Sequence, residues 1–415
     1  MPRIALIGGN ARPITTAHEL GVDVVLVHEE GRYEPDFADY CSRILHAPIG
    51  DSAAILKVLR PLHAEEPFDA VLSATEYAAI AAGEVADALG VPGTTARTAR
   101  ALKDKAETRR LLDEHDLSPI RHAMVASEEE TADFAESVGG RIVVKPADGV
   151  ASLHVHVVES REDAATAFKH LREAGYTRAI AEEYLEGPVV SVDTFSYQGR
   201  HVVFGMSEYQ MNDRFVEWEV STPSRVAAPH RAELTELVGR LLDVVGLTDG
   251  PAHSEFVLTP DGPKVLESHD RFAGSGAPEL VRRACGVDLY RMFLAVQLGF
   301  EELPQTSPVN DHGAAIRFFT PQPGTLKEIT GLDTVDALVL TVPPGEAKGN
   351  IVPLLSRTRE AEVVVVITRH PGDTLPELRS VKDCSSGYVI ATGKDADEAT
   401  AICERVVSQI CFHVE

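Results

Sequence analysis

The sequence predicts a mixed α/β protein in which a parallel α/β domain precedes a larger α+β body. Over roughly the first 95 residues, short apolar segments alternate with helix-length segments, which is typical of a parallel sheet covered by helices. From about residue 119, apolar segments come as adjacent pairs joined by tight turns, and strands joined in that way are antiparallel. A further change follows near residue 300, where more strand-like segments precede a last helix.

The N-terminal domain is expected to span residues 1–95 and to be followed by a connecting helix within 96–118. Its apolar segments alternate with stretches of helical pattern, and a strong helical pattern continues up to residue 115. The expected strands are 3–9, 22–28 and 69–74, and the expected helices are 51–62, 76–89 and 98–115.

The rest of the chain is expected to divide into a central subdomain at 119–190 and a C-terminal subdomain at 191–415, with a mixed α/β part appended from about residue 300. Residues 208–228 are polar and aromatic with little periodicity, which predicts a functional loop. The expected hairpins pair 141–146 with 153–158, 189–197 with 200–206, and 251–258 with 263–268. The expected helices are 161–173, 230–246, 277–298 and 394–411, and the late strands are 313–319, 336–342 and 361–368.

Charge and composition exclude several classes of partner. The 39 basic and 64 acidic residues give a net charge of 39 − 64 = −25, which disfavours a nucleic-acid partner. The first apolar run is far shorter than the roughly 18 residues of a membrane span, and it lacks a signal-peptide cleavage pattern. The five cysteines are scattered without a CxxC motif, which is poor material for disulfides or zinc. We therefore expect a cytoplasmic protein with no membrane partner.

Two lysines and a pair of carboxylates stand out in the middle of the chain. Lys105 follows an aspartate inside a helical pattern, and Lys145 ends an apolar strand, where a lysine is rare without an anion to meet. Residues 147–152 form a small-residue turn whose backbone N–H groups suit either a plain hairpin or a phosphate loop. Glu182 and Glu183 end a strand before a glycine turn.

The sharpest pattern is a hairpin that carries two glutamates. Glu255 lies six residues before Asp261, and Glu267 lies five residues after Gly262, so the two carboxylates are expected nearly opposite each other. Two carboxylates that close would repel, and a divalent cation resolves the repulsion. His269 and Arg271 follow Glu267 at intervals of two, so their side chains are expected near the same spot.

In this order, the motifs resemble the ATP-grasp superfamily, and most of all its carboxylate–amine ligases of the L-amino acid ligase type. The resemblance covers nearly the whole chain. It implies the ATP-grasp fold with a biotin-carboxylase-like N-terminal domain. The motifs are DKxxxR from Asp104, VVKPADGxxS from Val143, EEYLxG from Glu182, HxEF from His253, and Leu266-Glu267.

The resemblance also implies roles for individual residues, with ATP and Mg²⁺ (or Mn²⁺) as cofactors. Glu255 and Glu267 match the metal ligands, and Arg271 matches the arginine that stabilises the transferring phosphoryl group. The residues implied to contact ATP are Lys105, Lys145, Gly149, Ser152, Glu182, Glu183, Tyr184 and Leu185.

Three positions depart from the pattern. His269 stands where relatives have an asparagine beside the metal, and it remains a candidate ligand. Leu153-His154 stands where relatives often have a glycine, and Val189-Val190 stands where a ribose-binding glutamate is usual. Asp193 is the nearest replacement for that glutamate.

The implied function is ATP-dependent activation of a small carboxylate, such as an amino acid, as an acyl phosphate that an amine then attacks. Candidate substrate contacts are Glu76, Trp218, Arg225 and Gly274, and similar proteins are usually homodimers. Two alternatives remain open: another ATP-grasp carboxylate activator of the nucleotide-precursor or carboxylase type, and a nucleotide-binding regulator without catalysis.

Overall fold

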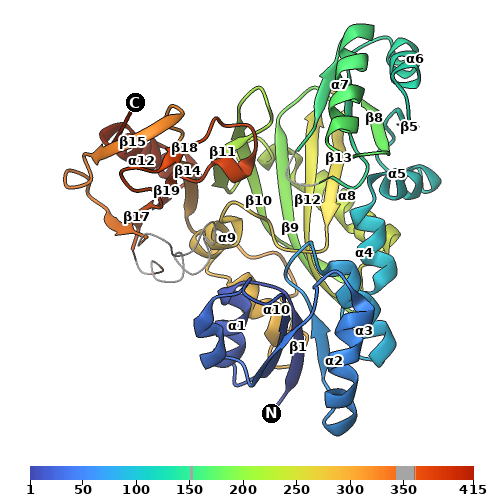
Figure 1. The fold of residues 1–415 in the computed structure, drawn as a ribbon, viewed down its shortest axis with the longest axis vertical. Coiled ribbons are helices and arrows are strands. Elements are labelled where there is room, and N and C mark those ends of the chain that lie inside the picture. The colour runs from blue at the N-terminus through green and yellow to red at the C-terminus, as the bar shows by residue number, and fades with distance from the viewer. Residues whose placement is uncertain (150–152, 343–358, 360) are drawn as a thin grey trace.

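The computed structural model describes residues 1–149, 153–342, 359 and 361–415. Its N-terminal part is a four-stranded parallel sheet in the order β3-β2-β1-β4, and helices cover both faces (Figure 1). The strands are β1 (Arg3–Ile7), β2 (Asp23–His28), β3 (Arg43–His46) and β4 (Ala70–Leu72). The helices are α1 (Ala11–Glu19), η1 (Pro35–Asp39), α2 (Ser52–Glu65) and α3 (Ala79–Leu89). The predicted parallel α/β start of the chain is therefore confirmed, with β3 as an additional strand that the sequence analysis missed.

The helical segment expected at 98–115 is two helices, α4 (Ala96–Lys103) and α5 (Lys105–Glu114). Asp104 lies between them with extended backbone angles, and its side chain accepts hydrogen bonds from the N–H groups of Ala106 and Glu107. An aspartate in that position is a strong N-cap, so it ends one helix and starts the next. The break places Lys105 at the first position of α5.

The next unit is a small antiparallel sheet in the order β5-β8-β6-β7 with two helices packed on it. We call this unit, which spans residues 122–183, the lid. Its strands are β5 (His122–Val125), β6 (Ile142–Pro146), β7 (His156–Val158) and β8 (Ala179–Glu183), and its helices are α6 (Glu128–Val138) and α7 (Arg161–Glu173). The expected hairpin between 141–146 and 153–158 is present as β6 and β7.

The remaining strands form a nine-stranded sheet in the order β13-β12-β9-β10-β11-β14-β19-β17-β16, together with a small sheet, β18-β15-β20. The strands up to residue 269 are β9 (Val189–Tyr197), β10 (Arg200–Met211), β11 (Glu217–Thr222), β12 (Gly250–Thr259) and β13 (Gly262–His269). The later strands are β14 (Gly313–Phe318), β15 (Gly324–Thr330), β16 (Leu338–Thr341), β17 (Val363–Ile367), β18 (Thr374–Leu375), β19 (Gly387–Gly393) and β20 (Cys411–Val414). The strands after residue 300 thus extend the central sheet through the β11–β14 pairing.

The helices of this part are η2 (Ala228–His230), α8 (Arg231–Val245), α9 (Ala277–Cys285), α10 (Leu289–Ala295), η3 (Val381–Asp383) and α12 (Ala396–Gln409). The expected helix 277–298 is interrupted at Gly286, which has a φ of +77°. The loop expected at 208–228 is also wrong, because the end of β10 and all of β11 lie within it. Apolar and polar residues alternate from Val216 to Ser221, and the sequence analysis missed this strand signal.

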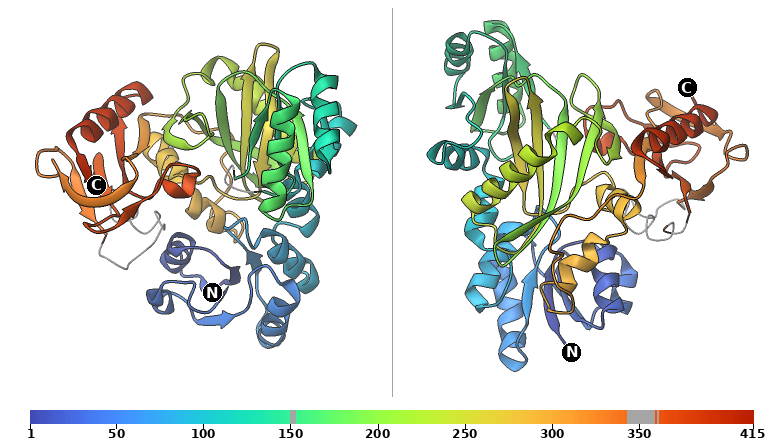
Figure 2. Two further views of the ribbon diagram at one scale, coloured as in Figure 1. Left: turned by 45° about the horizontal axis from the view of Figure 1, so that its top comes forward. Right: turned by 180° about the vertical axis from the view of Figure 1, so that it is seen from behind.

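The two faces of the central strands have different environments. Helix α8 covers one face (Figure 2, right). Its Leu234, Val238 and Leu241 pack against apolar side chains of β9, β10, β12 and β13. The opposite face carries polar side chains such as Asp193, His253 and Glu267 and looks toward the lid and the N-terminal domain. This alternation places the polar residues together beneath the lid. Among the described residues, no helix is long and apolar enough to cross a membrane.

Candidate active site

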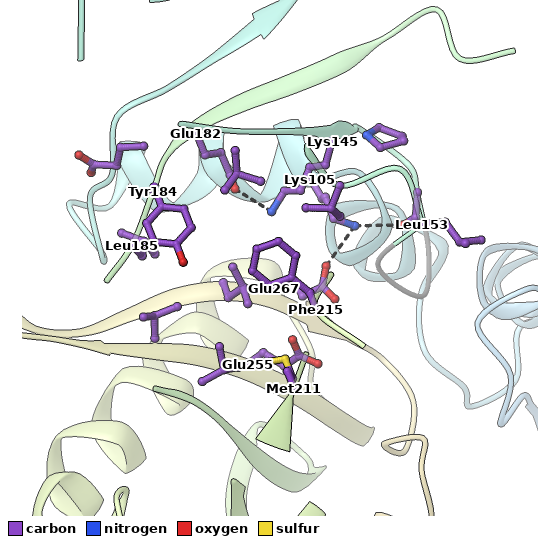
Figure 3. A pocket seen from close by; sticks show the side chains of 18 of the residues that line it. Lys105, Lys145, Leu153, Glu182, Tyr184, Leu185, Met211, Phe215, Glu255 and Glu267 are labelled. Atoms are coloured by element: carbon purple, nitrogen blue, oxygen red, sulfur yellow. Dashed lines mark hydrogen bonds and ion pairs between the residues drawn. The ribbon is translucent and has the colours of Figure 1, made fainter. Parts of the chain in front are cut away.

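A cleft of about 1170 Å³ lies between the lid and the β12–β13 hairpin, and part of its volume is open to solvent (Figure 3). One end is charged and the other is apolar. The charged end has Lys105, Lys145, Glu182, Glu217, Glu255 and Glu267, and the remainder includes Val143, Leu153, Tyr184, Leu185, Val189, Met211, Phe215, Val257 and Leu266.

The two predicted lysines enter the cleft from different elements. Lys105, at the start of α5, places its Nζ 3.1 Å from Glu267 Oε2 and 3.1 Å from the carbonyl oxygen of Gly149. Lys145, at the end of β6, places its Nζ 2.7 Å from Glu182 Oε2. Both ammonium groups are thus held at the charged end by carboxylates of the chain itself (Figure 3).

Glu182 is bound by two cations at once, one of which the sequence analysis did not select. Arg109 of α5 donates from Nε to Glu182 Oε1 over 2.6 Å. Burial would raise the pKa of Glu182, but Arg109 and Lys145 outweigh it and lower that pKa from 4.5 to about 2. The carboxylate is therefore ionised at neutral pH although it is completely buried. The signal for Arg109 in the sequence was its position four residues after Lys105, on the same side of a helix.

The β12–β13 hairpin aligns Glu255 and Glu267 as direct partners in the antiparallel register. Leu266 has no partner of its own, and this bulge takes up the extra residue on β13, since Glu255 lies four residues before Thr259 and Glu267 five residues after Gly262, the partner of Thr259. Burial would raise the pKa of Glu267, but Lys105 and His269 hold it well below its usual value. His269 Nε2 lies 3.2 Å from Glu267 Oε1, so this imidazole orients the carboxylate.

A third carboxylate, Glu217 of β11, faces the same end of the cleft. Its pKa is raised to about 7, first by burial and then by the negative charge of Glu255. Its Oε2 accepts a long hydrogen bond, 3.4 Å, from the hydroxyl of Ser275. The sequence analysis did not select Glu217, because it stood in a segment read as a loop.

Asp193 does not line the cleft, in contrast to its expected contact with the ribose. It lies within the sheet below the cleft, 4% exposed, and its Oδ1 is 2.9 Å from Nδ1 of His253. The other ring nitrogen of His253 is 3.2 Å from Glu255 Oε1. Burial would lower the pKa of His253, but Asp193 and Glu255 raise it to about 10. Asp193 and His253 therefore fix the position of Glu255 from below.

The apolar end of the cleft suits a flat aromatic base. Tyr184 and Leu185, directly after β8, lie together on the lid side, and Met211 and Phe215 lie on the opposite wall, next to Glu255 and Glu267 (Figure 3). The guanidinium of Arg141 stacks 4.2 Å from the centre of the Tyr184 ring and holds the ring in place. Glu183 also lines the cleft, and its Oε1 accepts a hydrogen bond from the Arg121 N–H.

Arg271 lies beside the charged end together with Glu76 of the N-terminal domain. Arg271 Nε is 3.1 Å from Glu76 Oε2, and Lys103 Nζ is 2.6 Å from Glu76 Oε1. Burial would raise the pKa of Glu76, but His269, Arg271 and Lys103 lower it. The structure thus brings the N-terminal domain to the end of the β12–β13 hairpin through the carboxylate of Glu76.

The other candidate residues are not brought into this cleft. Trp218 packs under the guanidinium of Arg317 at 4.5 Å, and Arg225 forms ion pairs with Glu208 and Asp397. Gly274 lies in the segment between β13 and α9, where its carbonyl accepts from the Ala277 N–H. Of the expected phosphate loop, Gly149 lines the cleft, and Ser152 lies outside the described residues.

The charged end fits a Mg²⁺ ion that arrives with a nucleotide. Among the described residues, no group of three or more His, Cys, Asp or Glu side chains is arranged to hold a metal alone. Mg²⁺ in nucleotide sites characteristically takes one or two carboxylates, with phosphates and waters completing its shell. The paired Glu255 and Glu267 would provide those carboxylates, and a cation there would relieve the repulsion between them.

Comparison with known proteins identifies the class to which this architecture belongs. Residues 138–279 match the ATP-grasp domain family, and residues 14–93 match the ATP-grasp N-terminal domain. The chain therefore contains an ATP-grasp domain and an ATP-grasp N-terminal domain. Within that class, residues 339–415 match the L-amino acid ligase C-terminal domain 2, so its resemblance to the L-amino acid ligases is confirmed as well.

Individual proteins agree with this assignment. An L-arginine-specific L-amino acid ligase of Bacillus subtilis is 24% identical over 306 residues, which cover 71% of this chain and 74% of the relative. The structure of an L-amino acid ligase from Bacillus licheniformis superposes with a TM-score of 0.80 at 22% identity, over 100% of this chain and 99% of that one. A biotin carboxylase from Campylobacter jejuni gives a TM-score of 0.71 at 15% identity, over 99% and 92%, and confirms the predicted fold class.

Proposed function

We propose that the protein is an ATP-dependent ligase that activates the carboxylate of an amino acid as an acyl phosphate and joins it to an amine. The observation that carries this proposal is the convergence of Lys105 and Lys145 with the paired Glu255 and Glu267 at one end of the cleft. Phosphoryl transfer needs positioned cations around the phosphates and little covalent chemistry from the protein.

The nucleotide would lie along the cleft with its base at the apolar end. Leu185 follows β8, and its backbone can bond the edge of the base, while the side chains of Tyr184 and Leu185 enclose its faces. The N–H groups of Glu183 and Tyr184 donate to the carbonyls of Arg121 and Arg141 instead. Lys105 and Lys145 would then exchange their present carboxylate partners for phosphate oxygens.

Glu255 and Glu267 would hold Mg²⁺, with His253 and His269 orienting the two carboxylates. When bound, the metal would neutralise charge that develops on the phosphates during transfer. We assign His269 to the support of Glu267 because its Nε2 already points at that carboxylate.

Chemistry requires a substrate carboxylate beside the γ-phosphate. Its oxygen attacks the γ-phosphorus, the bond to ADP breaks, and Arg271 compensates the charge of the transferring group. An amine then attacks the acyl carbon and loses a proton, and phosphate leaves. Because water would hydrolyse the acyl phosphate, the lid above the cleft would exclude it.

The substrates would bind between this end of the cleft and the N-terminal domain. Glu76 reaches Arg271 directly, and the segment that contains Gly274 and Ser275 leads from Arg271 to Glu217. We keep Glu76 and Gly274 as substrate candidates. Trp218 and Arg225 are not proposed, because their side chains bind Arg317, Glu208 and Asp397. We also propose a homodimer, as in similar proteins, which light scattering after size exclusion would test.

An ADP-release assay with pairs of carboxylates and amines, followed by mass detection of the product, tests the function. The expected result is substrate-dependent ADP with an amide or dipeptide product. A regulator without catalysis would bind ADP and give neither. Glu267→Ala should abolish ADP formation because a metal ligand is lost, and retained turnover would refute the metal assignment.

A further inference from the structure

Helix α5 presents two cations, Lys105 and Arg109, four residues apart, and each contacts both walls of the cleft. Lys105 binds the carbonyl of Gly149 on the lid and Glu267 on β13. Arg109 binds Glu182 on the lid, and it also donates from Nη1 to the carbonyl of residue 265 over 2.8 Å and from Nη2 to that of residue 266 over 3.1 Å.

The two cations differ in whether a ligand in the cleft can reach them. The side chain of Lys105 is 12% exposed and lines the cleft, whereas that of Arg109 is 3% exposed and does not. Three of the guanidinium N–H groups are already used in fixed directions. A planar guanidinium can satisfy all three partners together, which a lysine ammonium cannot do from one point. Arg109 therefore stays in place whatever enters the cleft.

Glu182 uses a different oxygen for each of its cations. Oε1 accepts from Arg109 at 2.6 Å, and Oε2 is 2.7 Å from Lys145. Lys145 can therefore leave Oε2 without disturbing the bond to Arg109. If Lys145 were the only partner, its departure would leave a fully buried carboxylate without a compensating charge, which is strongly unfavourable.

We propose that Arg109 is a positioning residue that compensates Glu182, so that Lys145 is free to move from this carboxylate to the phosphates of a nucleotide. This rests on the proposed function in one respect, namely that the cleft binds ATP or ADP. Without Arg109, Glu182 would retain Lys145, and the cleft would lose one of its two phosphate-binding lysines.

The test is a double-mutant cycle on ADP affinity, measured by calorimetry on the full chain with Mg²⁺. Arg109→Met should weaken ADP binding by about tenfold or more, because the buried carboxylate then holds Lys145. Adding Glu182→Gln to that variant should recover about threefold or more of the affinity, since the charge that retains Lys145 has gone. Glu182→Gln alone provides the fourth corner of the cycle.

Arg110→Met is the matched control, because Arg110 lies on the exposed side of the same helix and its ion pairs among the described residues are with Glu107 and Glu114. It should bind ADP like the wild type. Arg109→Lys, checked by circular dichroism, serves if Arg109→Met does not fold. Arg109→Lys keeps a positive charge beside Glu182. Its ADP affinity should therefore be lower than that of the wild type and higher than that of the Arg109→Met/Glu182→Gln double variant.

Three results would overturn the inference: unchanged ADP affinity in Arg109→Met, a double variant that binds no better than Arg109→Met, or an Arg109→Lys variant that binds no better than that double variant. The last two would show that Arg109 acts only through the fold. Failure of the proposed function looks different. A wild-type protein that binds no ADP refutes the nucleotide cleft itself, whereas one that binds ADP but forms no product refutes the ligase and leaves this cycle valid.

Discussion

Replacing Glu182 by glutamine should destabilise the protein in a pH-dependent way. The pKa of this carboxyl group falls from 4.5 to about 2 on folding, through Arg109 and Lys145 acting against burial. One pKa unit corresponds to about 1.4 kcal/mol, so ionised Glu182 contributes on the order of 3 kcal/mol at pH 7. Because the folded-state pKa is the lower one, this contribution is complete above the unfolded-state pKa and is lost as the pH falls toward 2.

The assay is chemical unfolding of the wild type and Glu182→Gln between pH 7 and pH 4. The stability difference should be about 3 kcal/mol at pH 7 and should shrink by about 1 kcal/mol at pH 4. Glu186→Gln is the matched control, since Glu186 is an exposed carboxylate near the end of the same strand, 73% accessible. A difference that stays constant over this range, or one that grows toward acid, would refute the assignment of the ion pair.

Two further predictions concern the walls of the cleft. Gly187→Ala should cost about 3 kcal/mol and raise the KM for ATP, because a Cβ there would lie 2.1 Å from the Leu258 carbonyl oxygen at a φ of +149°. Gly175→Ala, at a φ of +87° with no atom within 4 Å, should cost about 1 kcal/mol; equal losses in thermal unfolding would contradict this reasoning. His253→Gln should weaken Mn²⁺ binding to the ADP complex about tenfold, measured by electron paramagnetic resonance, because Glu255 loses its support. Unchanged Mn²⁺ affinity would contradict that role.

The parts of the site that the sequence predicted are those with short-range signals. The β12–β13 hairpin has a clear turn and flanking apolar segments, so the nearly opposite placement of Glu255 and Glu267 followed from counting. Lys145 stood out because a lysine within an apolar strand needs an anion, and Glu182 is that anion in the structure.

The parts that were missed depend on distant segments. Glu217 faces the cleft because β11 pairs with β14, almost a hundred residues later, and local composition does not report that pairing. Asp193 was assigned to the nucleotide, but strand pairing places it opposite His253, below the cleft. The bond from Arg109 to residues 265 and 266 likewise joins segments more than 150 residues apart. Propensity and periodicity cannot predict such contacts.

In the structure, each cation at the charged end is paired with a carboxylate of the same chain: Lys105 with Glu267, Lys145 with Glu182, and Arg271 with Glu76. A nucleotide must therefore displace these carboxylates. Mg²⁺ on Glu267 would release Lys105 to the phosphates, so metal and nucleotide should strengthen each other's binding by the same factor. In Glu267→Gln, Lys105 is already free of its anionic partner. The factor by which Mg²⁺ raises ADP affinity, measured by calorimetry, should consequently be at least about fivefold smaller in this variant than in the wild type. An equal effect of Mg²⁺ in both proteins would show that Glu267 does not exchange Lys105 for the metal.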